Sequence, residues 1–251
     1  MKILVISDIH ANLEALEACL AAAPAYDRVF NLGDVVGYGA SPNEVVNKSR
    51  ELGGLLVRGN HDKACSGITN AEDFNHIAMV ASFWTKETLT PENLKWVKEL
   101  PKGPIKPEGV ENVQCVHGSP LDEDEYIIIV RDAYEPILES REALTFFGHT
   151  HIQGGFSAED DEWATLRPIY ETDNESENFV YQMSRTAKYL INPGSVGQPR
   201  DGDWRAAFCV FDSDLWNITY YRVPYNVEQA QRRIYEANLP DRLATRLQEG
   251  R

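Results

Sequence analysis

The stretch Lys2-Ile3-Leu4-Val5-Ile6-Ser7-Asp8-Ile9-His10 decides the fold. It opens with a continuous apolar run, which is typical of a strand buried on both faces. An aspartate and a histidine follow directly after the run. Residues 12–20 then show helical spacing, with Asn12 placed to cap the N-terminus of the helix. We therefore expect a strand, a functional loop and a helix in that order.

The same order continues along the chain. A strand is predicted at 28–32, a helix at Pro42–Leu52 with proline in its first turn, and a strand at 55–57. This β-α-β-α-β start predicts a largely parallel sheet whose loops gather at the carboxyl ends of the strands. The other predicted elements are helices at 71–100, 132–140, 227–237 and 242–248, and strands at 112–116, 143–147, 189–192, Ala206–Asp212 and 216–223. Trp84 and Trp96, on apolar stripes, are assigned to core packing.

Residues 157–188 differ in character because they are strongly acidic and carry few aliphatic side chains. We interpret them as an excursion at the surface, a solvated loop in preference to a hairpin. The last two predicted strands are joined by a short turn and should form an antiparallel hairpin. No repeat or long linker divides the chain, so residues 1–251 are expected to form one domain that ends in helices at 226–251.

Composition narrows the possible functions. The chain has 251 residues, 43% hydrophobic and 25% charged, as in an ordinary globular protein. Because 24 Lys and Arg stand against 39 Asp and Glu, for a net charge of −15, no basic surface is expected to bind a long nucleic acid. The four cysteines form no CxxC pair, and Cys115 and Cys209 lie in strand-like apolar runs where buried thiols are expected, which favours a reducing compartment. Met1 leads directly into a strand and no apolar run has membrane-spanning length, so we predict a cytoplasmic protein without membrane contact.

Five of the six histidines lie in or beside short polar segments that end apolar runs. The segments are Ser7-Asp8-Ile9-His10, Gly33-Asp34, Gly59-Asn60-His61-Asp62, Val116-His117-Gly118 and Gly148-His149-Thr150-His151. Each alone is a weak signal, since a histidine at a strand end is more often structural. All five in this order, each at a strand end, indicate a site for two neighbouring divalent metals.

The spacing within the segments supports that interpretation. Strand alternation would place Asp8 and His10 on the same side, and His149 and His151 repeat the spacing. The glycines before Asp34 and Asn60 allow close approach of the backbone, and Asp34 is best placed to bridge both ions. Without cysteine, a structural zinc-thiolate site is excluded, whereas Mn²⁺, Fe²⁺/³⁺, Co²⁺, Ni²⁺ or Zn²⁺ would suit these ligands. Two carboxylates leave positive charge on two divalent ions, which suits a phosphoryl group.

These segments, written D-x-H, G-D, G-N-H-[DE], H-G and G-H-x-H, resemble the calcineurin-like metallophosphoesterase superfamily. The stretches at 7–12, 33–39 and 192–200 resemble its small bacterial and archaeal phosphodiesterase branch. The resemblance implies an α/β fold, a two-sheet β-sandwich flanked by helices. It implies one ion on Asp8, His10, Asp34 and His151, and another on Asp34, Asn60, His117 and His149. His61 would then be catalytic, protonating or stabilising the leaving oxygen.

Departures from the family pattern bear on the substrate. Phosphoprotein phosphatases of the superfamily read G-D-x-V-D-R-G, whereas this chain has Gly37 and Tyr38 at the aspartate and arginine positions. Arg200 could supply the missing cation, or form an ion pair with Asp201 or Asp203. Tyr38 could stack on a base, or pack against its own loop.

The sequence therefore predicts an enzyme with two divalent metals, manganese favoured, acting on a small phosphodiester or a dinucleoside polyphosphate. A hydroxide bridging the ions would attack phosphorus in line with the leaving group. Two alternatives are a phosphomonoesterase, acting on phosphoproteins or metabolites, and a non-catalytic scaffold. The scaffold is disfavoured because the retromer subunit that resembles this family lacks the catalytic histidine, and His61 is present here.

Overall fold

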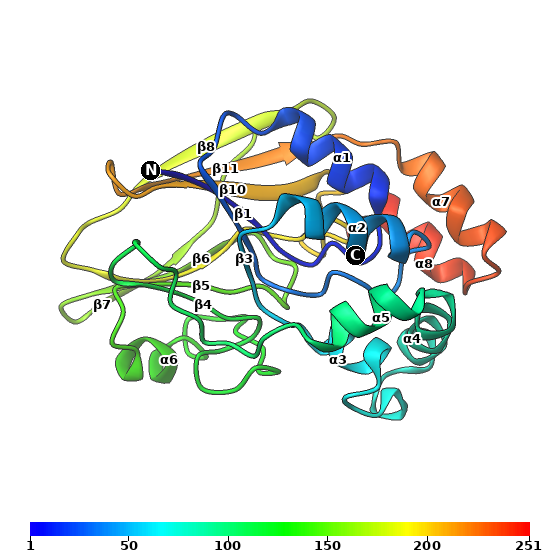
Figure 1. Ribbon diagram of the computed structural model, residues 1–251. Helices are drawn as coiled ribbons and strands as arrows, with labels where there is room; N and C mark the ends of the chain where they lie inside the picture. Colours follow the sequence, from blue (N-terminus) through cyan, green and yellow to red (C-terminus); the bar gives the residue numbers. More distant parts are fainter.

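Strand β1 (Lys2–Ile6) is buried on both faces because each face meets a different layer. In the computed structural model, which describes residues 1–251, Ile3 and Val5 point into a core between two sheets. Leu4 and Ile6 point the other way, into a core shared with helices. The apolar run thus correctly predicted a strand that is buried on both faces. This strand lies at the centre of a helix–sheet–sheet–helix arrangement (Figure 1).

The first sheet has the strand order β3-β2-β1-β10-β11-β8. Its other strands are β2 (Arg28–Asn31), β3 (Leu55–Leu56), β8 (Glu177–Gln182), β10 (Ala206–Asp212) and β11 (Asn217–Val223). The parallel pairing of β1, β2 and β3 confirms the predicted start. The sheet is nevertheless mixed, since β10, β11 and β8 pair antiparallel. The prediction of a largely parallel sheet is wrong for β10, β11 and β8, because the β10–β11 turn returns the chain without a crossover helix.

The second sheet has the order β4-β5-β9-β6-β7. Its strands are β4 (Val113–Cys115), β5 (Leu144–Phe146), β6 (Gly154–Glu159), β7 (Glu162–Leu166) and β9 (Lys188–Asn192). The adjacent strands β4, β5 and β9 run parallel, while β6 pairs antiparallel with both β9 and β7. Cys115, Phe146 and Ile191 meet Ile3 and Phe211 of the first sheet in the shared core.

Helices cover both outer faces. They are α1 (Leu13–Ala22), α2 (Pro42–Leu52), α3 (Asn60–Ser66), α4 (His76–Thr88), α5 (Pro91–Lys98), α6 (Tyr134–Glu139), α7 (Val227–Glu236) and α8 (Asp241–Thr245), with 3-10 turns η1 (Ala71–Asp73) and η2 (Arg246–Gln248). Only α6 covers the second sheet (Figure 1). Asn12 caps α1 as predicted, accepting a hydrogen bond from the main-chain N–H of Ala15 at 3.1 Å. Trp84 and Trp96 pack against the helical core, as expected.

The acidic stretch 157–188 is not a solvated loop. It contains most of the β6–β7 hairpin and all of β8, which crosses to the edge of the first sheet beside β11. Phe179 and Tyr181 pack partly against the inter-sheet core, whereas Asn178 and Val180 face outward. An edge strand needs only one half-buried face, so its hydrophobic signal is weak and the surrounding acidic residues masked it. The four cysteines are buried and unpaired, which confirms the buried thiols predicted at Cys115 and Cys209. No helix combines the length and apolar character needed to cross a bilayer.

Candidate metal centre

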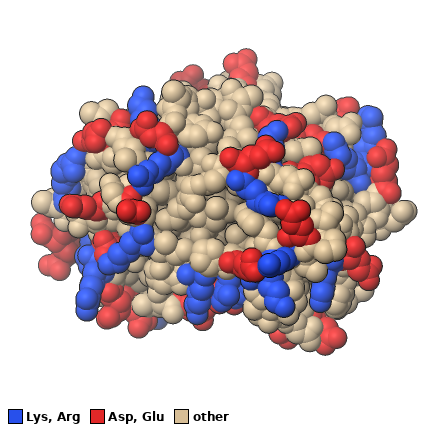
Figure 2. All heavy atoms as spheres, in the orientation of Figure 1, with Lys and Arg blue, Asp and Glu red and all other residues tan.

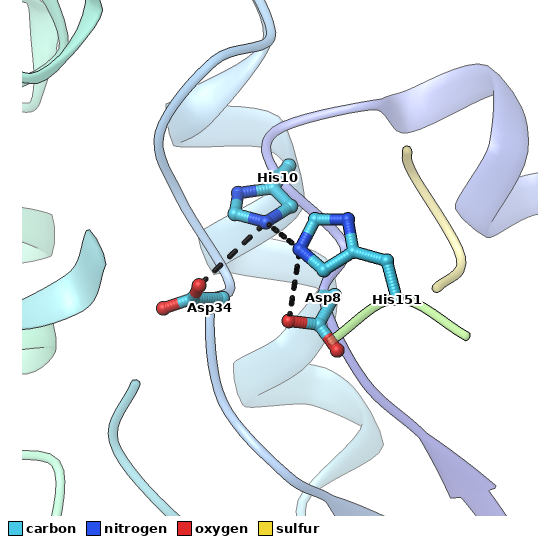
Figure 3. Close-up of side chains that lie close together, drawn as sticks. All are labelled: Asp8, His10, Asp34 and His151. Atoms are coloured by element: carbon cyan, nitrogen blue, oxygen red, sulfur yellow. Dashed lines mark hydrogen bonds and ion pairs between the residues drawn. The ribbon is translucent and has the colours of Figure 1, made fainter. Parts of the chain in front are cut away.

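Four buried residues from three segments converge beyond the carboxyl end of β1. They are Asp8, His10, Asp34 and His151, and one ligand-type atom from each lies within 4.8 Å of the others (Figure 3). Nε2 of His10 lies 3.1 Å from Nε2 of His151 and 3.6 Å from Oδ2 of Asp34. Nε2 of His151 lies 3.3 Å from Oδ1 of Asp8. The structure therefore brings together the first predicted set.

A second cluster shares Asp34 with the first. Asp34, His117 and His149 offer ligand-type atoms within the same 4.8 Å limit. Nε2 of His117 lies 3.4 Å from Oδ2 of Asp34 and 3.2 Å from Oδ1 of Asn60. All residues of the second predicted set thus adjoin, and Asp34 stands between the two groups as the bridging interpretation requires.

The hydrogen-bond partners of these histidines indicate that the cluster fits cations. Each ring uses one nitrogen on a backbone carbonyl: Val36 for His10, Leu32 for His117, Gln198 for His151 and Asp124 for His149. A carbonyl can only accept, so that nitrogen carries the hydrogen and the other presents a lone pair. Nε2 of His10 and Nε2 of His151 therefore face each other lone pair to lone pair, and the buried Oδ2 of Asp34 has no donor. A divalent metal relieves both conflicts.

The pKa values agree with neutral ligands at three of the four histidines. Burial lowers the pKa of His10 well below its usual value, lowers that of His151, and lowers that of His149 to about 3. Burial also acts on His117, but Asp34 and Asp8 outweigh it and raise its pKa to about 10. The two carboxylates thus demand a positive charge at this position, which bound metal ions would supply in place of a proton.

The route by which Asp8 and His10 meet differs from the prediction. Strand β1 ends at Ile6, so strand alternation does not align them. Both residues instead adopt left-handed backbone conformations, with φ of 53° and 49°, and so does Asp34, with φ of 52°. Such strain costs about 1–3 kcal/mol per residue and is typical of functional loops. Hydrogen bonds between the loops hold it, from the His10 N–H to the Asp34 carbonyl and from the Asp8 N–H to the Gly33 carbonyl, each 2.9 Å.

The glycine of the third segment is required by close approach. A Cβ at Gly59 would lie 2.0 Å from Oδ1 of Asp34. That same oxygen accepts a 2.8 Å hydrogen bond from the main-chain N–H of His61, at the start of α3. Gly59 therefore lets the α3 terminus hold the shared carboxylate.

His61 lies beside the cluster and outside both sets. Its ring packs against Tyr38 at 4.3 Å, Phe74 at 4.7 Å and His10 at 5.0 Å between centroids. The buried Nδ1 has no hydrogen-bond partner, and a Cβ at Gly37 would lie 2.8 Å from it. Position 37 is therefore directly next to the ring but provides no carboxylate. Burial lowers the pKa of His61 to about 4.

The two substrate-binding candidates have different outcomes. Tyr38 is 7% exposed and packs against His10 and His61, as the packing alternative expects, so little of its ring is open to a base. Arg200 forms no ion pair with its neighbours, because Asp201 pairs with Arg222 and Asp203 with Arg205. Its guanidinium contacts the amide oxygen of Gln198 at 2.9 Å.

Tyr126 was missed by the sequence analysis. Its ring stacks on His149, with centroids 3.8 Å apart and an interplanar angle of 28°, and the residue is 47% exposed. It belongs to the loop after β4, where Asp124 gives the carbonyl that orients His149. The only sequence signal for Tyr126 was its place in the loop that directly follows His117 and Gly118. An exposed aromatic at the centre thus comes from Tyr126 and not from Tyr38.

Asp62 also has a role that the motif did not reveal. Its carboxylate accepts main-chain hydrogen bonds from Asp34 and Gly59 at 2.9 Å each, and from Val36 at 3.2 Å. Burial and the charge of Asp34 raise the pKa of Asp62 to about 7, against the donors that favour its ionised form. Asp62 therefore ties the Asp34 loop to α3.

Comparison with known proteins agrees with this geometry. Residues 1–214 match the model of the calcineurin-like phosphoesterase superfamily domain. An uncharacterized protein of Methanocaldococcus jannaschii is 38% identical over 99% of this chain and 98% of its own length. A crystal structure of a metallophosphoesterase from Sphaerobacter thermophilus is 39% identical, with a TM-score of 0.83 over 100% of this chain and 99% of its own. A hypothetical protein of Pyrococcus horikoshii OT3 shares the fold, with 17% identity and a TM-score of 0.79 over 100% of this chain and 98% of its own.

The two-sheet fold flanked by helices is therefore that of known metallophosphoesterases, and membership implies a phosphoester hydrolase. The family and the Asp/His cluster together indicate a dinuclear divalent metal site. The chain belongs to the calcineurin-like phosphoesterase superfamily.

Proposed function

We propose that this chain hydrolyses small phosphodiesters or dinucleoside polyphosphates, with two divalent metals, manganese favoured. One observation carries the metal assignment: the donorless Oδ2 of Asp34 lies between the inward Nε2 atoms of His10 and His117. One ion would be held by Asp8, His10, Asp34 and His151, and the other by Asp34, Asn60, His117 and His149. Bound there, the ions would lower the pKa of a water molecule and neutralise phosphoryl charge.

The proposed role of His61 is to protonate or stabilise the leaving oxygen. Its main-chain N–H holds Asp34, while neither ring nitrogen is engaged by another protein group. Three aromatic rings fix its plane, so the side chain is held in place without a carboxylate partner. Asn60, which precedes it on α3, would add an amide to the charge-stabilising groups.

The surroundings favour a diester or a polyphosphate over a phosphoprotein. Position 37 provides no aspartate beside His61, and position 38 provides no arginine. Tyr126 offers an exposed ring against which a base could stack, worth about 1–3 kcal/mol. Figure 2 shows acidic and basic side chains interspersed over one face without a continuous basic tract. The net charge of −15 further disfavours a long polynucleotide.

The test is a panel of mono-, di- and pyrophosphate esters, each assayed with Mn²⁺, Fe²⁺, Co²⁺, Ni²⁺ and Zn²⁺. Diesters or dinucleoside polyphosphates should have higher kcat/KM than monoesters, with Mn²⁺ best or nearly so. A phosphopeptide or sugar monophosphate that is cleaved faster than every diester and dinucleotide would establish the phosphomonoesterase alternative. Metal binding without hydrolysis of any ester would establish the alternative of a non-catalytic scaffold.

A further inference from the structure

Two arginines lie against the ring of Tyr38. The guanidinium carbon of Arg200 is 5.6 Å from the ring centroid, and that of Arg246 is 6.0 Å from it. Arg200 comes from the loop after β9, whereas Arg246 begins η2 near the C-terminal end of the chain. The fold therefore brings together two cations that are remote in sequence.

Neither guanidinium pairs with an Asp or Glu side chain, although acidic residues outnumber basic ones by 39 to 24. The guanidinium of Arg200 donates to Gln198 and lies against the Tyr38 ring, and Nε of Arg246 donates to the terminal oxygen of Arg251. Glu249 is close in sequence, but Arg242 holds both of its oxygens, at 2.9 and 2.8 Å. Burial and the charge of Arg200 lower the pKa of Arg246 to about 10. Two neighbouring guanidinium groups without an Asp or Glu partner are a typical anion-binding arrangement.

The pair lies next to the metal cluster. The Tyr38 ring is 4.7 Å from His10 and 4.3 Å from His61, so one aromatic ring separates the arginines from the proposed metal and acid groups. The main-chain N–H of Arg200 also donates to the carbonyl of His151, at 3.1 Å. An anionic group bound by the arginines would therefore belong to a molecule that also reaches the metals.

We propose that Arg246 and Arg200 form an anion subsite for a second phosphate group of the substrate. The inference rests on the proposed function and narrows it, because a simple diester has no second phosphate whereas a dinucleoside polyphosphate has several. Arg246 lies outside residues 1–214, the part matched by the family model, so this specificity comes from the C-terminal segment of the chain. That segment acts here as part of the binding site and not only as a cover for the core.

Binding is the direct test. A methylene-bridged analogue of diadenosine tetraphosphate, which resists hydrolysis, is titrated into metal-loaded protein by calorimetry. Arg246→Gln should raise Kd about tenfold or more, as expected for loss of charge-assisted hydrogen bonds. Arg232→Gln is the matched control, because Arg232 is exposed on α7 and also loses one positive charge. It should change Kd by no more than about twofold. Arg246→Lys keeps the charge without the planar fork and should bind with intermediate affinity.

Kinetics separate this subsite from the proposed function. The ratio of kcat/KM for diadenosine tetraphosphate to that for bis(4-nitrophenyl) phosphate should fall about tenfold in Arg246→Gln. Equal analogue affinity in Arg246→Gln and the wild type, with unchanged metal content and Tm, would overturn the subsite. Arg246-dependent affinity for inorganic phosphate but not for the analogue would also overturn it. If the wild type cleaves no ester yet still needs Arg246 to bind the analogue, the proposed function fails and the subsite stands.

Discussion

Glu123 is the residue whose removal tests how the loop after β4 is held against the metal centre. Its carboxylate accepts two hydrogen bonds from Arg58, each 3.0 Å, and lies 3.1 Å from the Lys63 ammonium. Arg58 and Lys63 flank the third motif, and Glu123 precedes Asp124, whose carbonyl orients His149. The side chain of Glu123 is only 14% exposed. Replacing it by glutamine removes the charge while keeping the shape.

The stability lost in Glu123→Gln follows from the pKa of Glu123. Partial burial raises the pKa of Glu123, but Arg58 and Lys63 outweigh it and lower the pKa from 4.5 to about 2. That difference corresponds to about 3 kcal/mol at most, and screening by water near the surface reduces it to about 1–2 kcal/mol. Because the pKa is depressed in the folded state, the stabilisation is fully present above pH 4.5. It is lost as the pH falls toward about 2.

The assay is urea unfolding of the metal-free wild type and Glu123→Gln, with a chelator present so that metal binding does not contribute to the free energy of unfolding. At pH 7 the variant should be less stable by about 1–2 kcal/mol, and the difference should shrink below about pH 4.5. Glu92→Gln is the matched control, since Glu92 pairs with Arg50 at 2.7 Å but its side chain is 74% exposed. Its loss should be at most about 0.5 kcal/mol.

A loss of unfolding free energy in Glu123→Gln that equals the loss in Glu92→Gln, or that does not change with pH, would refute this account of the Glu123 ion pairs. A functional consequence is also expected, because the loop carries the carbonyl that binds the outer nitrogen of His149. Metal affinity at saturating substrate should fall about 10–100-fold, as is usual when the support of a ligand is loosened.

Four further predictions concern the centre itself. Chelation should abolish hydrolysis of a generic phosphodiester and Mn²⁺ should restore it; full activity of metal-free protein would contradict the metal assignment. His61→Ala should lower turnover by about 10²–10⁴-fold while the metal content by elemental analysis stays unchanged; loss of metal would instead make His61 a ligand. Asp34→Asn should lose bound metal because the shared negative charge is gone, and full metal occupancy would exclude a bridging role. Tyr126→Ala should raise KM for a dinucleotide by about 5–150-fold, equivalent to 1–3 kcal/mol, and an equal change for a substrate without a base would argue against stacking.

Much of the metal cluster could be predicted from sequence because its members are local to strand ends. Apolar runs predicted β1, β2 and β5, and each run ends at polar residues that the fold collects at one edge. The order of the segments then carried the long-range information that spacing alone lacks. Strand alternation, by contrast, was the wrong reason for pairing Asp8 with His10, because left-handed loop conformations bring them together. The backbone conformation of a functional loop is set by its tertiary hydrogen bonds, which no local pattern records.

The β8 strand shows the opposite case, in which the local signal was misleading. Its acidic surroundings predicted solvent, yet Phe179 and Tyr181 were sufficient to cover the edge of the inter-sheet core. Pairing with β11 supplies the backbone hydrogen bonds of an edge strand whatever its outer side chains are. The acidic composition therefore predicted the solvent-facing side of this segment correctly, but not that the segment forms a strand.

The residues proposed to select the substrate differ in kind from those proposed to bind metal. Tyr126 and Arg246 occur in no motif, and each acquires its role only through a contact across the fold, with His149 and with Tyr38. One lies in the loop after β4 and the other in η2, on segments that surround the centre without forming it. Side chains such as those of Tyr126 and Arg246 can change while the metal ligands stay in place, because the strained loops are held by their own hydrogen bonds. The same metal centre can therefore serve different phosphoesters, and the proposed subsite at Arg246 and Arg200 would direct it toward substrates that carry more than one phosphate.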